Sequence, residues 1–302
     1  MEQTFYSNGK LLITGEYVVL DGAIAFALPT KFGQYLKIDD SKNNSIKWTS
    51  YDSDGSIWFE STIPFESIIN KETFKSDKVK TTLIEILHHA YLLNPDFLNS
   101  QGYTIKTELT FPKFWGLGTS STLINNISQW LKIDAFTLLK NSFGGSGYDI
   151  ACAQNNTPIL YHLENGKPLI TPVNFIPDYS NKIYFIYLNQ KQNSREAIHN
   201  YYNKKGDINK VIPLINTITQ QIVEAKEAKA FAKAIQNHEI EMSNVLETQT
   251  VQEALFPEFE GVVKSLGAWG GDFVLAISKE NPTEYFNNKG YITVIPYSEM
   301  IL

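Results

Sequence analysis

A run of glycines and small hydroxyl residues at positions 114–122, Phe-Trp-Gly-Leu-Gly-Thr-Ser-Ser-Thr, constrains this chain more than any other feature. Before it, apolar and polar residues alternate over positions 103–111, which predicts a strand. After it, apolar residues recur at helical spacing over positions 123–131, which predicts a helix. The glycine-rich run is therefore the connection between a strand and a helix.

Such a connection favours the binding of an anion. Gly116 and Gly118 let the main chain approach a ligand closely, and we expect Thr119, Ser120 or Ser121 at the helix N-cap. Unpaired N–H groups and the positive end of the helix dipole would then face the anion. The alternative is an ordinary strand-to-helix turn with a hydroxyl cap. No Walker lysine motif occurs, and the third glycine of a dinucleotide fingerprint is missing at Ser121.

Composition restricts the class of protein. A chain of 302 residues with 43% hydrophobic content can bury a large core and is expected to form two lobes. No signal peptide or membrane-spanning run is evident, so we expect a cytoplasmic protein without membrane contact. The net charge of −6 and the lack of a basic, aromatic-rich run argue against a nucleic-acid partner. The single cysteine, Cys152, excludes an internal disulfide and sits among apolar neighbours that indicate packing.

The chain has a single arginine, Arg195, shortly after an apolar strand predicted over positions 183–188. A guanidinium can form two parallel hydrogen bonds to a carboxylate or phosphate, which lysine cannot do. Arg195 is therefore a candidate ligand for an anionic substrate. The alternative is a surface arginine near the start of a helix at Glu196.

Other segments give a coarse map of the fold. Positions 9–28 predict a hairpin around Asp21-Gly22, positions 39–62 two strands around Asp54-Gly55, and positions 78–93 a helix. Positions 211–247 predict helices with a solvated exterior. Two further glycine-rich loops remain. The loop over 143–149 ends at Asp149, which is either delivered into a site or part of a simple turn; the loop over 267–272 leads into a strand.

Three of these segments together resemble the GHMP kinases, which include galactokinase, homoserine kinase, mevalonate kinase and phosphomevalonate kinase. Ser7-Asn8-Gly9-Lys10 followed by Gly15-Glu16-Tyr17 is similar to the family's opening P-G-K-x-x-x-x-G-E-[HY], with Asn8 in place of proline. Gly116-Leu117-Gly118-Thr119-Ser120-Ser121 is similar to its phosphate loop G-L-G-S-S-A. Gly267–Asp272 is similar to its third motif, G-A-G-G-G, with Trp269 replacing a glycine. The resemblance spans nearly the whole chain.

The resemblance implies an α+β, two-lobed fold. The N-terminal, ATP-binding domain would span 1–175 and carry the glycine loop, and a C-terminal α/β domain would span 176–302. It further implies transfer of the γ-phosphoryl group of ATP to a hydroxyl of a small anionic metabolite, with Mg²⁺ bridging the phosphates. The phosphates would lie on the loop Gly116, Leu117, Gly118, Thr119, Ser120 and Ser121, and Ser120 would bind Mg²⁺.

Asp149, in the sequence S-G-Y-D, occupies the position of the proposed catalytic base of mevalonate kinases, and the resemblance makes Lys10 its ion-pair partner. A nearby ammonium keeps the carboxylate ionised. One departure concerns the metal: Leu138 stands where mevalonate kinase has a magnesium-binding glutamate. Either another carboxylate supplies this charge, or Mg²⁺ is held by Ser120, water and ATP.

The substrate is predicted from the remaining matches. Ser194 and Arg195 resemble the S-T-[KR] substrate segment of mevalonate and phosphomevalonate kinases, and Glu16 belongs to the first motif. Gly270, Gly271 and Asp272 resemble G-G-G-D of bacterial phosphomevalonate kinases, whereas the sequence around Asp149 favours mevalonate kinase. We therefore expect mevalonate as substrate, in isoprenoid precursor synthesis, with phosphomevalonate as the alternative.

Two further readings stay open. A decarboxylase of the same fold would act on mevalonate diphosphate and release CO₂ with ADP. A non-catalytic ATP-binding regulator would bind ATP without substrate-dependent ADP release. The resemblance is compatible with a monomer or a homodimer.

Overall fold

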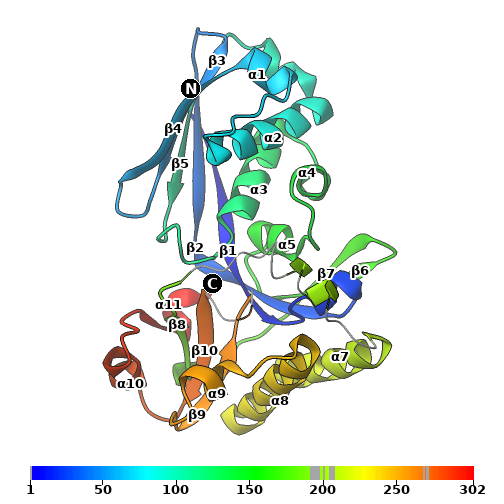
Figure 1. The fold of residues 1–302 in the computed structure, drawn as a ribbon, viewed down its shortest axis with the longest axis vertical. Coiled ribbons are helices and arrows are strands. Elements are labelled where there is room, and N and C mark those ends of the chain that lie inside the picture. Colours follow the sequence, from blue (N-terminus) through cyan, green and yellow to red (C-terminus); the bar gives the residue numbers. More distant parts are fainter. Residues whose placement is uncertain (1, 191–197, 200, 204–207, 268, 270–271) are drawn as a thin grey trace. The chain divides into compact units, whose positions relative to one another are not determined.

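The computed structural model describes residues 2–190, 198–199, 201–203, 208–267, 269 and 272–302. These residues form two compact units (Figure 1), and the chain passes between them more than once. The first unit comprises Met1–Gly9, Phe32–Lys113 and Leu117–Gln154, and the second comprises Lys10–Lys31, Phe114–Gly116 and Asn155–Leu302. The units thus do not divide at residue 175, and the predicted family domains 1–175 and 176–302 stay a prediction.

The first unit is a sheet with helices packed against it (Figure 1). Its strands follow the order β4-β3-β5-β2, where only β3 and β5 are parallel. Its elements, two of which continue into the second unit, are β1 (Gln3–Thr14), β2 (Ala25–Asp40), β3 (Ser45–Tyr51), β4 (Ile57–Pro64), α1 (Phe65–Ile69), α2 (Lys78–Leu93), η2 (Pro95–Asn99), β5 (Tyr103–Leu109), α3 (Thr119–Leu131), α4 (Ala135–Ser142) and α5 (Tyr148–Gln154).

Local sequence signals explain the bounds of these helices. The side chain of Asp77 accepts a hydrogen bond from Lys80 N at 2.9 Å and caps α2, and Asn94-Pro95 ends the helix where the sequence predicts. Asp134 caps α4 in the same way, through Thr137 N at 2.7 Å. The helix predicted over 78–93 is confirmed residue for residue.

The core of the first unit lies between its sheet and its helices. Alternate residues of β5 point inward, as the period-2 pattern predicts, and Tyr103 and Ile105 join the core. Helix α3 contributes Ile124 and Ile127, each fully buried. Burial of such a side chain contributes about 1.5–3 kcal/mol, so apolar packing holds α3 on the sheet.

The second unit contains a four-stranded antiparallel sheet of order β11-β8-β10-β9, and the strands β6 and β7 that extend from the first half of β2. Helices α7 and α8 pack against each other (Figure 1). Its other elements are η1 (Val18–Asp21), β6 (Ile159–Glu164), β7 (Lys167–Pro172), η3 (Ser180–Lys182), β8 (Ile183–Tyr187), α7 (Ile208–Glu224), α8 (Ala228–Leu246), α9 (Val251–Leu255), β9 (Gly261–Ser265), β10 (Phe273–Ser278), α10 (Thr283–Asn288), β11 (Val294–Pro296) and α11 (Tyr297–Met300).

Most elements predicted from the sequence are present. The opening hairpin is confirmed, since β1 pairs with β2, but its connection includes the short helix η1 and is longer than the predicted turn. The two strands predicted within 39–62 are β3 and β4, and the strand predicted after position 272 is β10, which begins at Phe273. Cys152 is fully buried, as its neighbours indicate. Within the described part of the chain, no helix is both long and apolar enough to span a bilayer.

Candidate active site

The glycine-rich connection between β5 and α3 ends in a left-handed glycine. Gly118 has φ +98° and is itself the N-cap of α3, with no side-chain capping bond, so Thr119 already belongs to the first turn. The prediction that Thr119, Ser120 or Ser121 caps the helix is therefore wrong. Glycine adopts a left-handed backbone at the lowest cost, so Gly118 takes the N-cap position and the helix begins earlier in the sequence than predicted. The first N–H groups of α3 are left without a capping side chain.

The hydroxyl groups of this first turn have different surroundings. Ser121 Oγ donates to Gly118 O at 2.9 Å, and Thr122 Oγ1 approaches the same carbonyl at 3.1 Å. Both side chains are buried, whereas Ser120 is exposed. Thr119 is partly exposed, and Ser120, the residue predicted to bind Mg²⁺, is the most exposed hydroxyl residue of the turn.

Two of the predicted residues, Lys10 and Asp272, lie against a third, Gly116, in the second unit. Lys10 Nζ donates to Gly116 O at 3.1 Å, which fixes its ammonium at the glycine loop. A Cβ added to Gly116 would lie 2.2 Å from Asp272 Oδ2, so the carboxylate of Asp272 packs directly on the glycine. Gly116 also has φ +68°. Glycine is required here for both the backbone conformation and the close approach.

Asp272, at the end of the third glycine loop, is held by its main chain. Its N–H donates to Gln190 O at 3.0 Å, and its carbonyl accepts from Leu188 N at 2.8 Å. Asp272 has φ +39°, an uncommon conformation for a residue with a side chain. These bonds hold the carboxylate of Asp272 in place against Gly116.

Asp149 lies in the first turn of α5, in the first unit. It is partly exposed, while its neighbour Ile150 is fully buried in the core and anchors the helix. Helix α5 packs against α3, so Asp149 and the first turn of α3 belong to two helices in contact (Figure 1). Lys10 belongs to the other unit, and its ion pair with Asp149 stays a prediction.

Leu138 has no exposed surface and lies in the core cluster of the first unit. The position that carries a metal-binding glutamate in mevalonate kinases is thus a packing position in this chain. Among the described residues, no group of three or more histidine, cysteine, aspartate and glutamate side chains is arranged to hold a metal ion. Ser120 remains the candidate metal ligand.

Glu16 is buried in a cluster of titratable residues within the second unit. Its Oε1 accepts a hydrogen bond from Lys264 Nζ, and His238 Nε2 lies 3.5 Å from its Oε2. His238 Nε2 also accepts from Gly15 N at 3.0 Å, so this nitrogen carries no proton. Direct substrate contact by Glu16 stays a prediction, and its side chain is 1% exposed in this structure.

Burial dominates the electrostatics of this cluster. It raises the pKa of Glu16, an effect that the Lys264 ammonium opposes, and it raises the pKa of Glu239 to about 7. Burial and then the Lys264 charge hold the pKa of His238 well below its usual range. The sequence did not reveal this cluster, because His238 and Glu239 lie in a helix whose composition predicts a solvated exterior.

Trp269, which replaces a glycine of the third motif, is anchored by Tyr17. Trp269 N donates to Tyr17 Oη at 2.9 Å, and the ring of Tyr17 stacks on Tyr201 with centroids 5.5 Å apart. Tyr201 in turn donates to Asp21 Oδ2 at 2.6 Å. The indole packs against the buried apolar cluster around these rings. The predicted substrate residues Ser194, Arg195, Gly270 and Gly271 lie outside the described residues.

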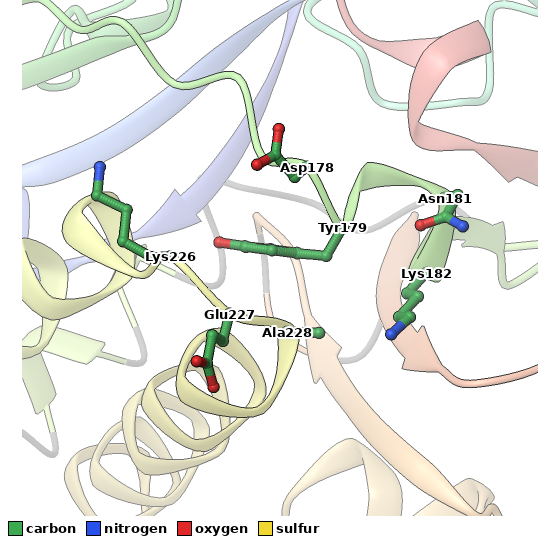
Figure 2. A pocket seen from close by; sticks show the side chains of 7 residues that line it. All are labelled: Asp178, Tyr179, Asn181, Lys182, Lys226, Glu227 and Ala228. Atoms are coloured by element: carbon green, nitrogen blue, oxygen red, sulfur yellow. The ribbon is translucent and has the colours of Figure 1, made fainter.

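A surface pocket of about 430 Å³ lies elsewhere in the second unit (Figure 2). It is lined by Asp178, Tyr179, Asn181, Lys182, Lys226, Glu227 and Ala228. None of the predicted site residues lines it. Figure 2 shows the amino groups of its two lysines on opposite sides of the Tyr179 ring, so they do not converge on a single anion.

No protein-family model matches the sequence, and no curated protein matches it either. Solved structures do match. Methanococcus jannaschii mevalonate kinase aligns with a TM-score of 0.71 at 15% identity over 97% of this chain and 96% of that one. The chain has the fold of the GHMP kinases.

Two further structures with this fold carry related activities in their names. Streptococcus pneumoniae phosphomevalonate kinase, in complex with phosphomevalonate and AMPPNP, aligns with a TM-score of 0.71 at 16% identity over 97% of this chain and 99% of that one. Staphylococcus aureus mevalonate diphosphate decarboxylase aligns with a TM-score of 0.63 at 11% identity over 98% and 95%. The predicted α+β GHMP-kinase fold is thus confirmed, and identities this low establish the fold alone.

Proposed function

We propose that this protein is an ATP-dependent kinase that transfers the γ-phosphoryl group of ATP to the hydroxyl of mevalonate. The observation that carries the proposal is in the first unit: α3 starts at a glycine without a capping side chain, and the helix packed against it carries Asp149 in its first turn. An anion-binding helix end can hold the phosphates and a carboxylate on an adjacent helix can orient the acceptor hydroxyl, two of the parts that phosphoryl transfer to an alcohol uses.

The first turn of α3 would bind the phosphates of ATP. Its uncapped N–H groups and the dipole of the helix favour negative charge, and Gly118 leaves room for a phosphate to approach the main chain. Lys10, whose ammonium lies at the carbonyl of Gly116, would add positive charge at the same loop. Ser120 supplies an oxygen ligand for Mg²⁺, which when bound neutralises charge on the phosphates.

Asp149 would accept the proton of the substrate hydroxyl. The hydroxyl oxygen forms a bond to the γ-phosphorus while the bond from that phosphorus to the β-phosphate oxygen breaks and ADP leaves. Because the transition state is loose, positioning of the hydroxyl matters more than the basicity of the carboxylate. Asp149 is partly exposed on α5, which leaves a path for a substrate to reach it.

The choice of mevalonate rests on the matches around Asp149 and on Arg195, whose guanidinium would bind the substrate carboxylate together with Ser194. Phosphomevalonate is the second candidate, favoured by Asp272 at the end of the third glycine loop. Asp272 packs on Gly116, so we assign its carboxylate to holding the phosphate loop in place. Gly270 and Gly271 would let the main chain of the third loop approach the substrate.

The test is ADP release with Mg-ATP across mevalonate, phosphomevalonate, mevalonate diphosphate, galactose and homoserine, followed by the mass of the product. A product heavier by one phosphoryl group with mevalonate supports the proposal; the same result with phosphomevalonate alone corrects the substrate. Release of CO₂ from mevalonate diphosphate would identify a decarboxylase. ATP binding without ADP release on any acceptor would contradict a kinase and support a regulator.

Asp149→Asn provides the matched variant. The asparagine is isosteric and partly exposed, so the fold is retained, while loss of the proton acceptor lowers kcat by about 100-fold or more. Asp178→Asn, an exposed carboxylate in the other unit, serves as the control and leaves kcat unchanged. Full activity of Asp149→Asn would remove Asp149 from the mechanism.

A further inference from the structure

A chain of buried polar side chains crosses the first unit behind the phosphate loop. It runs through α3, where two amide side chains are buried: Asn125 is 1% exposed and Asn126 is 0% exposed. Opposite them on β1, Ser7 is 1% exposed. Buried amides cost free energy unless each is hydrogen-bonded, so their presence on this face requires partners.

In the hydrogen bonds between these side chains, the donor and the acceptor of each bond are fixed. Asn126 Nδ2 donates at 2.9 Å to the main-chain carbonyl of Gln34, which can only accept. Asn126 Oδ1 must therefore accept, and it does so from Ser7 Oγ at 2.7 Å. Ser7 Oγ in turn accepts from Asn125 Nδ2 at 2.8 Å, and Asn125 Oδ1 accepts from Gln154 Nε2 at 3.0 Å. The carbonyl at one end thus sets the orientation of every amide.

The two ends of this hydrogen-bond series lie at the start of α3 and at the end of α5. The side chain of Gln34 also accepts from Thr122 Oγ1 at 2.8 Å, and Thr122 belongs to the turn that opens α3 behind Gly118. At the other end, Gln154 is the last residue of α5, the helix that carries Asp149 in its first turn. One directional series of hydrogen bonds therefore links β2, α3 and α5, all within the first unit.

We infer that this series of hydrogen bonds sets the register of α5 against α3 and so holds Asp149 at a fixed distance from the phosphate-binding end of α3. The inference rests on the proposed kinase function. Apolar packing is non-directional, whereas hydrogen bonds between specific atoms require defined distances and angles. Ser7, Asn125 and Gln154 are positioning residues, because they act through the two helices and do not contact substrate.

The test uses Gln154→Glu, because Gln154 is exposed and the glutamate has nearly the same shape. An ionised glutamate cannot donate to Asn125 Oδ1, and so it breaks the chain at its accessible end. At pH 8 we expect kcat to fall roughly tenfold, since small misplacements of reacting groups cost at least this much. The KM for Mg-ATP stays within about twofold of the wild-type value, because the first turn of α3 is unchanged.

The pH dependence separates positioning from simple damage. Protonation of the introduced glutamate restores a donor, so the ratio of variant to wild-type kcat rises as the pH is lowered toward the ordinary glutamate pKa of about 4.3. Hydrogen exchange of the full chain supplies a readout that does not depend on turnover. The peptide covering 148–152 should exchange faster in Gln154→Glu at pH 8 than in the wild type, whereas the peptide covering 119–123 should exchange at the wild-type rate.

Ser128→Ala is the matched control. Ser128 is 3% exposed on the same helix, but its hydroxyl donates at 2.9 Å to Ile124 O within α3 and lies outside the chain. This variant should leave kcat and the exchange of α5 unchanged. Unchanged kcat and exchange in Gln154→Glu would overturn the inference, as would a loss of kcat that does not recover at low pH. A wild-type protein that phosphorylates no acceptor overturns the kinase proposal, and the exchange result then decides the coupling of α3 to α5 by itself.

Discussion

Gly116 is the residue at which the phosphate loop and the third glycine loop meet, and it tolerates no side chain. Gly116→Ala would combine a left-handed backbone, φ +68°, with a Cβ 2.2 Å from the Asp272 carboxylate. Gly144 is the matched control, because its φ is +69° and nothing lies within 4 Å of an added Cβ. Both substitutions carry a backbone cost of about 1 kcal/mol, and Gly116→Ala adds a further cost of about 1–3 kcal/mol for overpacking.

Denaturant unfolding of the two variants measures this difference. Gly116→Ala should also weaken Mg-ATP binding, because the carbonyl that accepts from Lys10 shifts with the glycine. Adding Asp272→Gly to Gly116→Ala should recover the stability lost to the contact, leaving the backbone cost. Equal losses in Gly116→Ala and Gly144→Ala would show that the contact with Asp272 has no energetic weight.

Tyr17 anchors the loop residue Trp269 through a single hydrogen bond to its phenolic oxygen. Tyr17→Phe keeps the ring stacked on Tyr201 but leaves Trp269 N without its acceptor, so the variant should lose about 1 kcal/mol of unfolding free energy. Trp269 should also become more mobile. A change in its tryptophan emission would report this, with Trp269→Phe as the reference that identifies the contribution of Trp269. Emission and stability equal to those of the wild type would contradict the anchoring role.

At the scale of elements, α8 brings Glu239 to the strand that precedes the third glycine loop. Its carboxylate accepts from Val251 N at 3.1 Å and from Ser265 N at 3.2 Å, so it joins the start of α9 to the end of β9. Burial raises the pKa of Glu239 from 4.5 to about 7. A raised carboxyl pKa means that the folded protein binds this proton more tightly than the unfolded chain does.

The stability contributed by this proton is therefore present below about pH 4.5 and is lost as the pH rises to about 7. Glu239→Gln cannot titrate. We expect the unfolding free energy of the wild type, relative to this variant, to decrease between pH 4.5 and pH 7 and to level off above. A flat profile for Glu239→Gln would contradict a buried proton at this site.

Elements were predictable where a single periodic pattern covers them. The alternation in β5 and the Asp77 cap with Asn94-Pro95 around α2 specify their elements locally. The local sequence does not specify the start of α3, because three hydroxyl residues are candidates for the N-cap and the left-handed backbone of Gly118 decides the position. The buried face of α8 cannot be predicted from its pattern, because His238 and Glu239 are polar and their partners lie far away in the sequence.

For the whole molecule, the separate motifs predict more of the fold than the periodic patterns do. Three short segments predict the fold, although the chain is only 11–16% identical to the three solved structures named above. The same motifs did not predict which residues each segment contacts: Glu16 pairs with Lys264, and Asp272 lies against Gly116. Such contacts depend on the packing of distant segments, which local sequence does not encode.

Ligand binding tests the proposed nucleotide site in the intact chain, independently of any acceptor. A ligand that binds only the folded state stabilises it by about 2.7 kcal/mol at a concentration about one hundred times its Kd. Mg-AMPPNP should therefore raise the midpoint of thermal unfolding by several degrees. Lys10→Met should reduce this shift, because it removes the ammonium at the glycine loop. Asp149→Asn should show the same shift in the unfolding midpoint although it loses turnover, because Asp149 acts on the acceptor hydroxyl and α3 binds the phosphates. A shift abolished by Asp149→Asn but kept by Lys10→Met would reverse these two roles and place the nucleotide elsewhere.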